Sequence, residues 1–179
     1  MASLVVFHYY CCAFYPVLMF GAGTVYHIGP VEGWIAASPF NLFYNGGFEV
    51  CVFFVLSGYV LSNKFFASGE RQAVISGAVR RYIRLMVLVL FAVVAAYVLL
   101  AGHLYFNRPA SSITGSSWLA SANSYAPGFV DALKDGVWSV FFENPNLYFD
   151  NALWTMAVEF TGSFLVFSFL MLFGDLKNR

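Results

Sequence analysis

The hydrophobic positions of this chain gather into long runs separated by polar connections. The runs cover roughly residues 2–26, 48–66, 84–106 and 152–173. Each is close to the stretch of about 20 apolar residues that an α-helix needs to cross a bilayer. The pattern therefore predicts an all-α fold, a polytopic bundle of about four transmembrane helices that forms a single membrane domain over residues 1–179.

The connections between these runs predict additional, shorter helices. Residues 107–151 are mostly polar, but apolar side chains recur at helical spacing over 129–142. This indicates a short helix that is an interfacial segment, a buried lid or an ordinary surface helix. Residues 27–47 are rich in aromatic side chains and are expected at the membrane interface. Pro16, inside the first run, is expected to kink its helix.

Composition strengthens the membrane interpretation. The chain is 60% hydrophobic and 10% charged, and its mean hydropathy is +0.73, whereas soluble domains carry about 25% charged residues. The formal net charge of zero argues against a nucleic-acid partner. The cysteines all lie in apolar runs and are expected to be buried thiols: Cys11, Cys12 and Cys51.

The distribution of cations predicts the orientation of the spans. Most of them lie from the end of the second run to the start of the third, at Lys64, Arg71, Arg80, Arg81 and Arg84. Cytoplasmic loops carry the excess of Lys and Arg, so this connection is expected on the cytoplasmic side. Four alternating spans then place both the N-terminus and the C-terminus in the cytoplasm.

Ionisable side chains inside membrane spans are costly and are candidates for function, and His8 is the first of them. On a helix, His8 shares a face with Cys11 and Cys12. A metal site is one interpretation, but a fourth ligand is not evident and no metal is expected. The others are a hydrogen-bonded core histidine and a general base, because burial favours the neutral imidazole that accepts protons.

Glu159 is the second candidate, in the fourth run. Thr155, Gly162 and Ser163 share its helical face, so the carboxylate is expected to face protein or water and not lipid. It is either a hydrogen-bonded group that holds helices together, or a partner that orients the histidine or binds substrate.

The basic cluster of Arg80, Arg81 and Arg84 allows two interpretations as well. Such arginines at the cytoplasmic end of a helix commonly set topology and contact lipid headgroups. They could also bind the phosphates of a nucleotide-bearing donor, because guanidinium matches phosphate geometry. In the second run, Ser57 and Gly58 place small residues at the centre, which predicts close helix packing.

Four motifs occur in order along the chain: VVFHYY (5–10), FFVLSGYVLS (53–62), RRYIRL (80–85) and LWTMAVEFTGS (153–163). In this combination the chain resembles the membrane-bound acyltransferase 3 family, and most closely its fungal-type branch. Members of this family transfer acyl groups, usually from acyl-coenzyme A, onto hydroxyls or amines of sugars, lipids and small metabolites.

The resemblance implies a role for each candidate residue. His8 would be the catalytic histidine, which takes the proton of the acceptor hydroxyl, and Glu159 a polar residue of the bundle. Arg80, Arg81 and Arg84 would hold the phosphates of acyl-coenzyme A, and Ser57-Gly58 would be the tight packing point. No permanently bound cofactor is implied. The expected partners are the lipid bilayer, the acyl donor and the acceptor.

The resemblance also predicts that the chain is the N-terminal portion of a larger bundle. The family has about ten membrane helices of about 20 residues each, and its arginine upstream of the histidine would fall before Met1. The chain could therefore be inactive by itself. Two alternatives stay open: a non-catalytic membrane scaffold of the same fold, and half of a transporter, although the paired broken helices of transporters are not evident.

Overall fold

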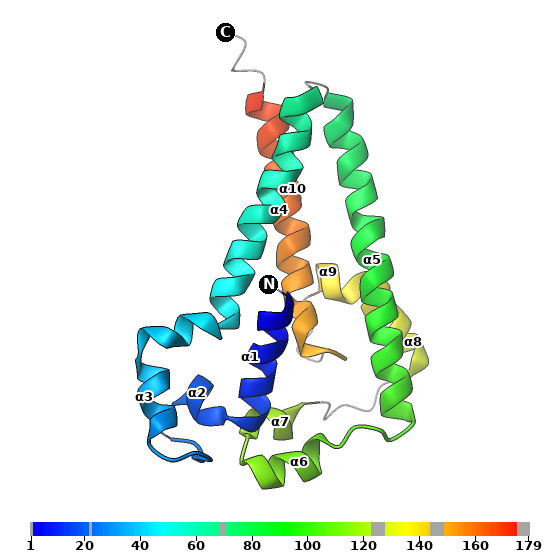
Figure 1. Cartoon of the computed structure of the whole chain (residues 1–179). Helices are drawn as coiled ribbons and strands as arrows, with labels where there is room; N and C mark the ends of the chain where they lie inside the picture. The colour runs from blue at the N-terminus through cyan, green and yellow to red at the C-terminus, as the bar shows by residue number, and fades with distance from the viewer. Residues whose placement is uncertain (1, 22, 69–70, 123–127, 144–148, 175–179) are drawn as a thin grey trace. The chain divides into compact units, whose positions relative to one another are not determined.

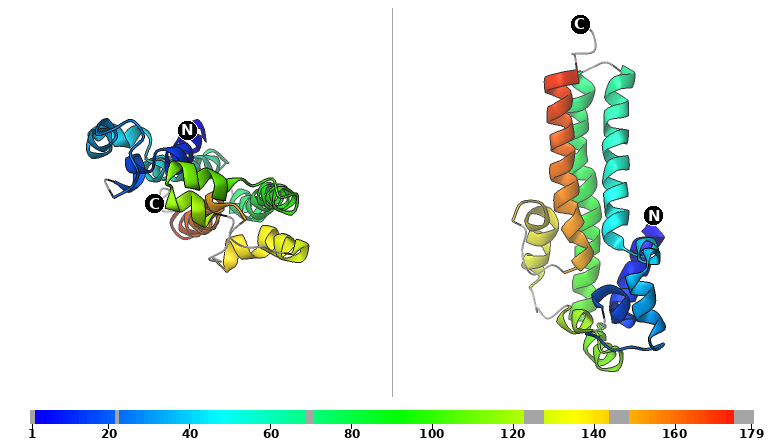
Figure 2. Two further views of the ribbon diagram at one scale, coloured as in Figure 1. Left: turned by 90° about the horizontal axis from the view of Figure 1, so that it is seen from below. Right: turned by 90° about the vertical axis from the view of Figure 1, so that its left-hand side faces the viewer.

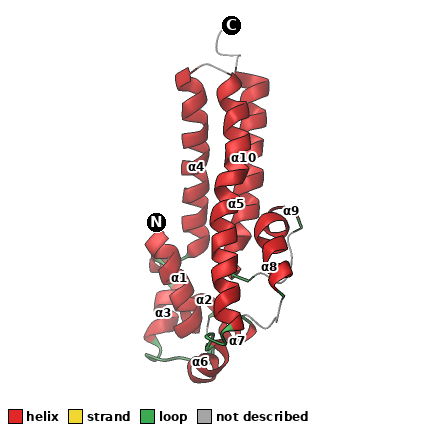
Figure 3. Ribbon diagram, turned by 90° about the vertical axis from the view of Figure 1, so that its right-hand side faces the viewer, coloured by secondary structure: helices red, strands yellow, loops and turns green. Residues whose placement is uncertain are grey.

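The computed structural model describes residues 2–174 except 22, 69–70, 123–127 and 144–148. Every regular element in this part of the chain is helical (Figures 1 and 3). In chain order the helices are α1 (Ala2–Phe14), α2 (Pro16–Phe20), α3 (Val31–Ala37), a 3₁₀-helix (Pro39–Phe43), α4 (Gly46–Ser68), α5 (Arg71–Ala101), α6 (Asn107–Thr114), α7 (Ser117–Ser121), α8 (Phe129–Lys134), a π-helix (Asp135–Ser139), α9 (Val140–Phe142), a 3₁₀-helix (Asn151–Leu153) and α10 (Trp154–Phe173). The predicted all-α class is confirmed.

Three of the described helical segments are long and apolar enough to cross a membrane: Gly46–Ala67, Ile75–Ala101 and Asn151–Phe173. Their outward faces are strongly apolar. On α5, for example, Leu88 and Phe91 are 68% and 76% exposed. Lipid tails satisfy such a surface, whereas water would not. The helical membrane bundle expected from the sequence is therefore confirmed, and the chain is a membrane protein.

The structure differs from the prediction in the first apolar run. Residues 2–26 do not form one helix, because α1 ends at Phe14 and the short α2 begins at Pro16. With 13 residues, α1 is about 20 Å long, shorter than the roughly 30 Å hydrocarbon core. Tyr15 has φ −133° and ψ 64° and is not helical. The ring of a proline clashes with the residue before it when that residue is helical, so Pro16 disfavours a helical Tyr15. Pro16 therefore ends the helix rather than merely kinking it.

The chain divides into two compact units, which are described separately. Unit 1 contains residues 1–53 and 104–124, and unit 2 contains residues 54–103 and 125–179. The expectation of a single membrane domain stays a prediction. In unit 1 the thiols of Cys11 and Cys12 are buried as expected, but Cys51 is exposed. Cys51 lies on α4, where an apolar side chain can face lipid, so burial within the protein was the wrong inference there.

The core of unit 2 is built on one face of α5. Leu85, Val89, Val93 and Ala96 recur every three or four residues along this helix and are all buried. Helix α10 packs against α5 (Figure 2), and a smaller cluster joins Phe65 of α4 to Phe167 of α10. Helix α5 begins at Arg71, well before the predicted start near residue 84, because the intervening residues include good helix formers such as Arg, Ala and Gln.

The predicted helix at 129–142 is present as α8, the π-helix and α9. It packs against α5 through buried side chains that include Ala132, Val140 and Phe141. Gly136 permits this approach, since a Cβ there would lie 2.8 Å from Cδ1 and 3.0 Å from Cα of Leu90. The segment is thus a packed part of unit 2 and not an isolated surface helix.

Candidate functional site

His8 is held at the start of α4 by the backbone of the turn that precedes that helix. Its Nδ1 lies 3.1 Å from the carbonyl oxygen of Tyr44 and 3.0 Å from the backbone nitrogen of Gly46. Its Nε2 lies 3.7 Å from Sγ of Cys12, one turn further along α1. The imidazole is half-buried. Both ring nitrogens of His8 are therefore in defined surroundings.

The two neighbours of Nδ1 each fit a different neutral tautomer of His8. If Nδ1 carries the proton, it donates to the carbonyl of Tyr44, and the lone pair of Nε2 faces the thiol of Cys12, which is a weak donor. If Nδ1 is unprotonated, it accepts the N–H of Gly46, and Nε2 carries the proton. Only the first tautomer leaves Nε2 as a base. The site can therefore support proton abstraction at Nε2.

Gly46 is required by this arrangement. A Cβ at Gly46 would lie 2.7 Å from Cγ and 2.8 Å from Cδ2 of His8. Such contacts are closer than van der Waals packing allows, so any larger residue would push the imidazole away. The sequence Asn45-Gly46-Gly47, which reads as a turn, thus also makes room for the histidine ring.

A second polar cluster lies in unit 2, around Arg81 of α5. Its guanidinium forms an ion pair with Glu159 of α10, and donates to Oγ of Ser163 at 3.1 Å. It also donates to Oγ of Ser57 on α4 at 2.9 Å. Arg81 and Glu159 are 15% and 6% exposed, so the pair is largely shielded. One arginine thereby links all three long helices of the chain.

The other two arginines of the basic cluster have different surroundings. Arg80 is exposed and donates to the carbonyl and hydroxyl oxygens of Ser76, one turn earlier on α5. Arg84 is exposed as well, without a hydrogen bond to any residue that the structure describes. These two side chains are available to an external anion, whereas that of Arg81 is already engaged.

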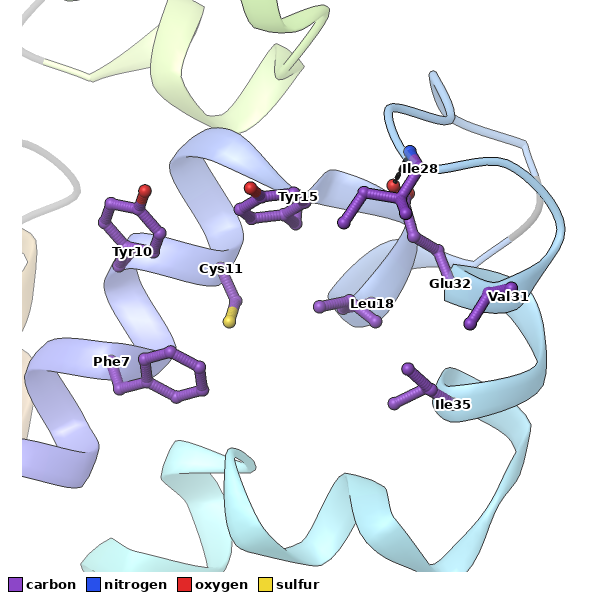
Figure 4. Close-up of a pocket in the computed structure, with 9 residues that line it drawn as sticks. All are labelled: Phe7, Tyr10, Cys11, Tyr15, Leu18, Ile28, Val31, Glu32 and Ile35. Carbon is purple, nitrogen blue, oxygen red and sulfur yellow. Dashed lines mark hydrogen bonds between the residues drawn. The ribbon is translucent and has the colours of Figure 1, made fainter.

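A largely apolar cavity of about 200 Å³ lies in unit 1 (Figure 4). Figure 4 shows Phe7 and Cys11 of α1 on one side of it and Leu18 and Ile35 on the other. Glu32 lies at its edge, where one carboxylate oxygen accepts the backbone N–H groups of His27 and Ile28. Phe7 and Cys11 neighbour His8 and Cys12 in sequence, so α1 contributes to both the cavity and the histidine site.

Comparison with known families identifies the chain. The sequence model of the acyltransferase 3 family, described as "Acyltransferase domain", matches residues 6–179. The chain belongs to the acyltransferase 3 family. No curated protein and no solved structure matches it. The match supports a membrane acyltransferase in general, and assignment to the fungal-type branch and to the N-terminal portion of the family stays a prediction.

Within this acyltransferase 3 chain, the predicted site residues fall into two groups. Glu159, Arg81 and Ser57 are brought together in unit 2. His8 belongs to unit 1, and a pairing between His8 and Glu159 stays a prediction. A Cβ at Gly58 would meet Cγ2 of Val166 at an ordinary 3.9 Å, so the close helix approach expected at Ser57-Gly58 also stays a prediction.

Sequence reasoning missed Glu49, in the first turn of α4. This carboxylate is 4% exposed, and neither oxygen has a hydrogen-bond partner among the residues described. The rule that singled out Glu159 would have found it, because Glu49 is the acidic residue of the run 48–66. It is the second residue of that run, directly after the turn at 45–47.

Metal ligation was considered for His8 because of its two neighbouring cysteines. Among the described residues there is no group of three or more His, Cys, Asp or Glu side chains that could hold a metal ion. Cys12 contacts Nε2 of His8, whereas Cys11 lines the cavity.

Proposed function

We propose that this membrane acyltransferase transfers an acyl group from acyl-coenzyme A to a hydroxyl or amine of a sugar, lipid or small metabolite, with His8 as the general base. The observation that carries the proposal is the seating of the imidazole of His8. In the tautomer whose Nδ1–H donates to the carbonyl of Tyr44, 3.1 Å away, Nε2 can accept a proton from an acceptor that takes the place of the Cys12 thiol. The N–H of Gly46, 3.0 Å from Nδ1, favours the other tautomer. Membership of the acyltransferase 3 family supports the reaction class.

The proton balance of the proposed step is simple. Nε2 of His8 takes the proton of the acceptor hydroxyl as its oxygen attacks the thioester carbonyl carbon. The C–S bond breaks, coenzyme A leaves as a thiolate, and the imidazolium returns the proton to the sulfur. The carbonyl of Tyr44 fixes the ring through Nδ1 during both transfers. A positioned base of this kind contributes typically 10²–10⁴-fold to the rate.

For the donor phosphates, we propose Arg80 and Arg84 as the binding groups. They lie one helical turn apart and both are exposed, so their guanidinium groups can reach the same anion. Arg81 then acts by holding α4, α5 and α10 together. This arrangement requires that end of α5 to face the cytoplasm, where the positive-inside rule also places it. The cytoplasmic placement of both termini stays a prediction.

For the acyl group, we propose the apolar cavity of unit 1. Dry apolar cavities of about 150 Å³ accept small hydrocarbons such as benzene. At about 200 Å³, this one suits a short acyl chain better than a long one. The cavity is lined by Phe7 and Cys11, the immediate α1 neighbours of the histidine site.

The test of this proposal compares the wild-type chain with His8→Ala in lipid nanodiscs. We expect acyl transfer from radiolabelled acetyl-coenzyme A to a panel of alcohols and amines, and a loss of about 10²-fold or more in His8→Ala. Both proteins should insert and show equal helicity by circular dichroism. His27→Ala is the matched control, because Nε2 of His27 contacts the carbonyl of Thr114 in unit 1, away from the proposed base.

Normal turnover in His8→Ala would refute the role of His8. Binding of coenzyme A to the purified chain is measured in parallel by isothermal titration calorimetry. If the chain neither binds coenzyme A nor transfers acyl groups, the scaffold interpretation replaces the enzymatic one.

A further inference from the structure

The start of α4 contains several buried polar atoms that have no hydrogen-bond partner in the described part of the chain. They are both carboxylate oxygens of Glu49 and the hydroxyl oxygen of Tyr44. The two residues are only 4% and 6% exposed. They flank Gly46 in sequence, and the backbone of Tyr44 and Gly46 contacts Nδ1 of His8.

Buried polar groups are normally satisfied, because leaving one without a partner costs about 1–3 kcal/mol and more for a charged group. Other buried carboxylates of this chain follow that rule at least in part. Glu159 binds Arg81, and one oxygen of Glu32 accepts two backbone N–H groups. Glu49 differs, since neither of its oxygens has such a partner among the described residues.

The unsatisfied atoms and the proposed base belong to the same local structure. The carbonyl of Tyr44 contacts Nδ1 of His8, while the hydroxyl of the same residue has no described partner. Glu49 lies three residues after Gly46, whose N–H also contacts Nδ1, and therefore on the same first turn of α4. Glu49 and Tyr44 thus border the turn that holds His8, and both carry buried polar atoms without a described partner.

We propose that Glu49 and the hydroxyl of Tyr44 bind the acceptor and select one that carries a second hydrogen-bond donor beside its reacting hydroxyl or amine. This inference rests on the proposed function, because it assumes that the reacting group lies at Nε2 of His8. Glu49 accepts the hydrogen bond of the second donor. Tyr44 donates its hydroxyl hydrogen to an oxygen of the acceptor, and no covalent bond changes at either residue.

This assignment gives a role to the acidic and phenolic groups that are buried at and just before the start of α4. A carboxylate accepts hydrogen bonds only, so what it requires is a donor from outside the described residues. A site built to bind a hydroxyl discriminates strongly against analogues that lack it, because its polar groups are then left without partners. Glu49 is accordingly a specificity-determining residue, and His8 keeps the proton transfer.

The test measures binding, and therefore does not depend on turnover. The probes are propane-1,2-diol and propan-1-ol, which differ by one hydroxyl, and their binding to the full chain in nanodiscs is measured by saturation-transfer NMR against empty nanodiscs. We expect the diol to bind about tenfold more tightly or better, as for a hydrogen bond to a charged group. Glu49→Leu, which removes both oxygens and leaves a shorter apolar side chain, should abolish the difference, and Glu49→Gln should reduce it.

Two further variants separate the proposed contacts from folding effects. Tyr44→Phe keeps the backbone carbonyl that holds His8, and should weaken diol binding without changing binding of the mono-alcohol. Glu143→Gln is the control, since that exposed carboxylate pairs with Lys134 at 3.1 Å in unit 2. Equal binding of the two probes to the wild type, or an unchanged preference in Glu49→Leu, would overturn the inference. Loss of turnover in His8→Ala together with either result would retain the proposed function alone.

Discussion

The chain contains two polar clusters of opposite character. Around Arg81, charge is balanced by Glu159, and Nε and Nη2 of the guanidinium donate to Ser163 and Ser57. Around His8, the backbone fixes the ring, yet Glu49 has no described partner. Both clusters lie in largely apolar surroundings, and each includes a buried carboxylate.

The difference shows how a structural role can be told from a functional role for a polar group in a membrane bundle. A satisfied network such as that of Arg81 has little capacity left for a ligand, and its effect is to hold helices together. A cluster whose polar atoms lack partners and which lies beside a titratable base can form hydrogen bonds with a ligand. We therefore assign stability to the Arg81 cluster and chemistry to the His8 cluster.

The largest expected effect comes from breaking the Arg81 cluster. Arg81→Ala leaves the buried carboxylate of Glu159 without its cation, and removal of one partner of such a pair typically costs 3–5 kcal/mol. The free energy of unfolding should fall by about this amount in a denaturant titration in micelles. Arg84→Ala, at an exposed position of the same helix, should change it by less than about 0.5 kcal/mol.

A double variant sharpens this prediction. In Arg81→Met combined with Glu159→Leu, no uncompensated charge remains, and most of the lost stability should return. If the double variant is no more stable than Arg81→Ala, the pair does not have the structural role assigned to it.

The next effect is expected at the His8 cluster. Gly46→Ala places a methyl group against the imidazole, and misplacing a catalytic group by about 1 Å can cost about 10²-fold in rate. Acyl transfer should fall by that order while the unfolding free energy changes much less. Gly23→Ala is a matched control in the same unit, because a Cβ at Gly23 meets nothing within 4 Å. Undiminished transfer in Gly46→Ala would argue against His8 as the base.

Asp135 tests whether an unsatisfied carboxylate is by itself a sign of function. It lies in the π-helix of unit 2, one of its oxygens has no described partner, and burial raises the pKa of Asp135 to about 6. The folded state therefore holds a proton that the unfolded state releases near pH 4. This contribution to stability is fully present below about pH 4 and is lost as the pH rises through about 6.

Asp135→Asn should remove that pH dependence and raise stability at pH 7 by about 1–2 kcal/mol. Unfolding measured between pH 4 and pH 8 checks it, and diol binding should be unchanged. A fall in diol binding would mean that the contrast between the clusters does not identify the binding site.

The smallest effect concerns the cavity. Leu18→Trp fills part of the roughly 200 Å³ and should lower transfer of a longer acyl chain, such as hexanoyl, several-fold more than transfer of acetyl. Competition between acetyl- and hexanoyl-coenzyme A measures this ratio. An unchanged ratio would place the acyl group elsewhere.

The long spans were predictable because hydropathy over about 20 residues is a local property of the sequence. The end of α1 at Phe14 was not predictable, because a proline inside an apolar run can either kink a helix or end it, and Pro16 ends it. The partners of Arg81 were not predictable, since Ser57 and Glu159 come from helices distant in sequence. His8 was found because it is the single histidine inside an apolar run. Glu49 lies at the start of its run, directly after the turn at 45–47, where a polar residue is common.

Helix α5 makes the protein sensitive to the thickness of its membrane. From Leu85 to Ala101 the helix is about 26 Å long at 1.5 Å per residue, somewhat less than a typical hydrocarbon core of about 30 Å. Arg84 therefore stands near the boundary between acyl chains and headgroups. In a thick, sterol-rich bilayer its guanidinium lies closer to the hydrocarbon core, and in a thin bilayer it lies among the headgroups. Choice of lipid should accordingly change the depth of Arg84, and with it the binding of the donor phosphates that we propose for this residue.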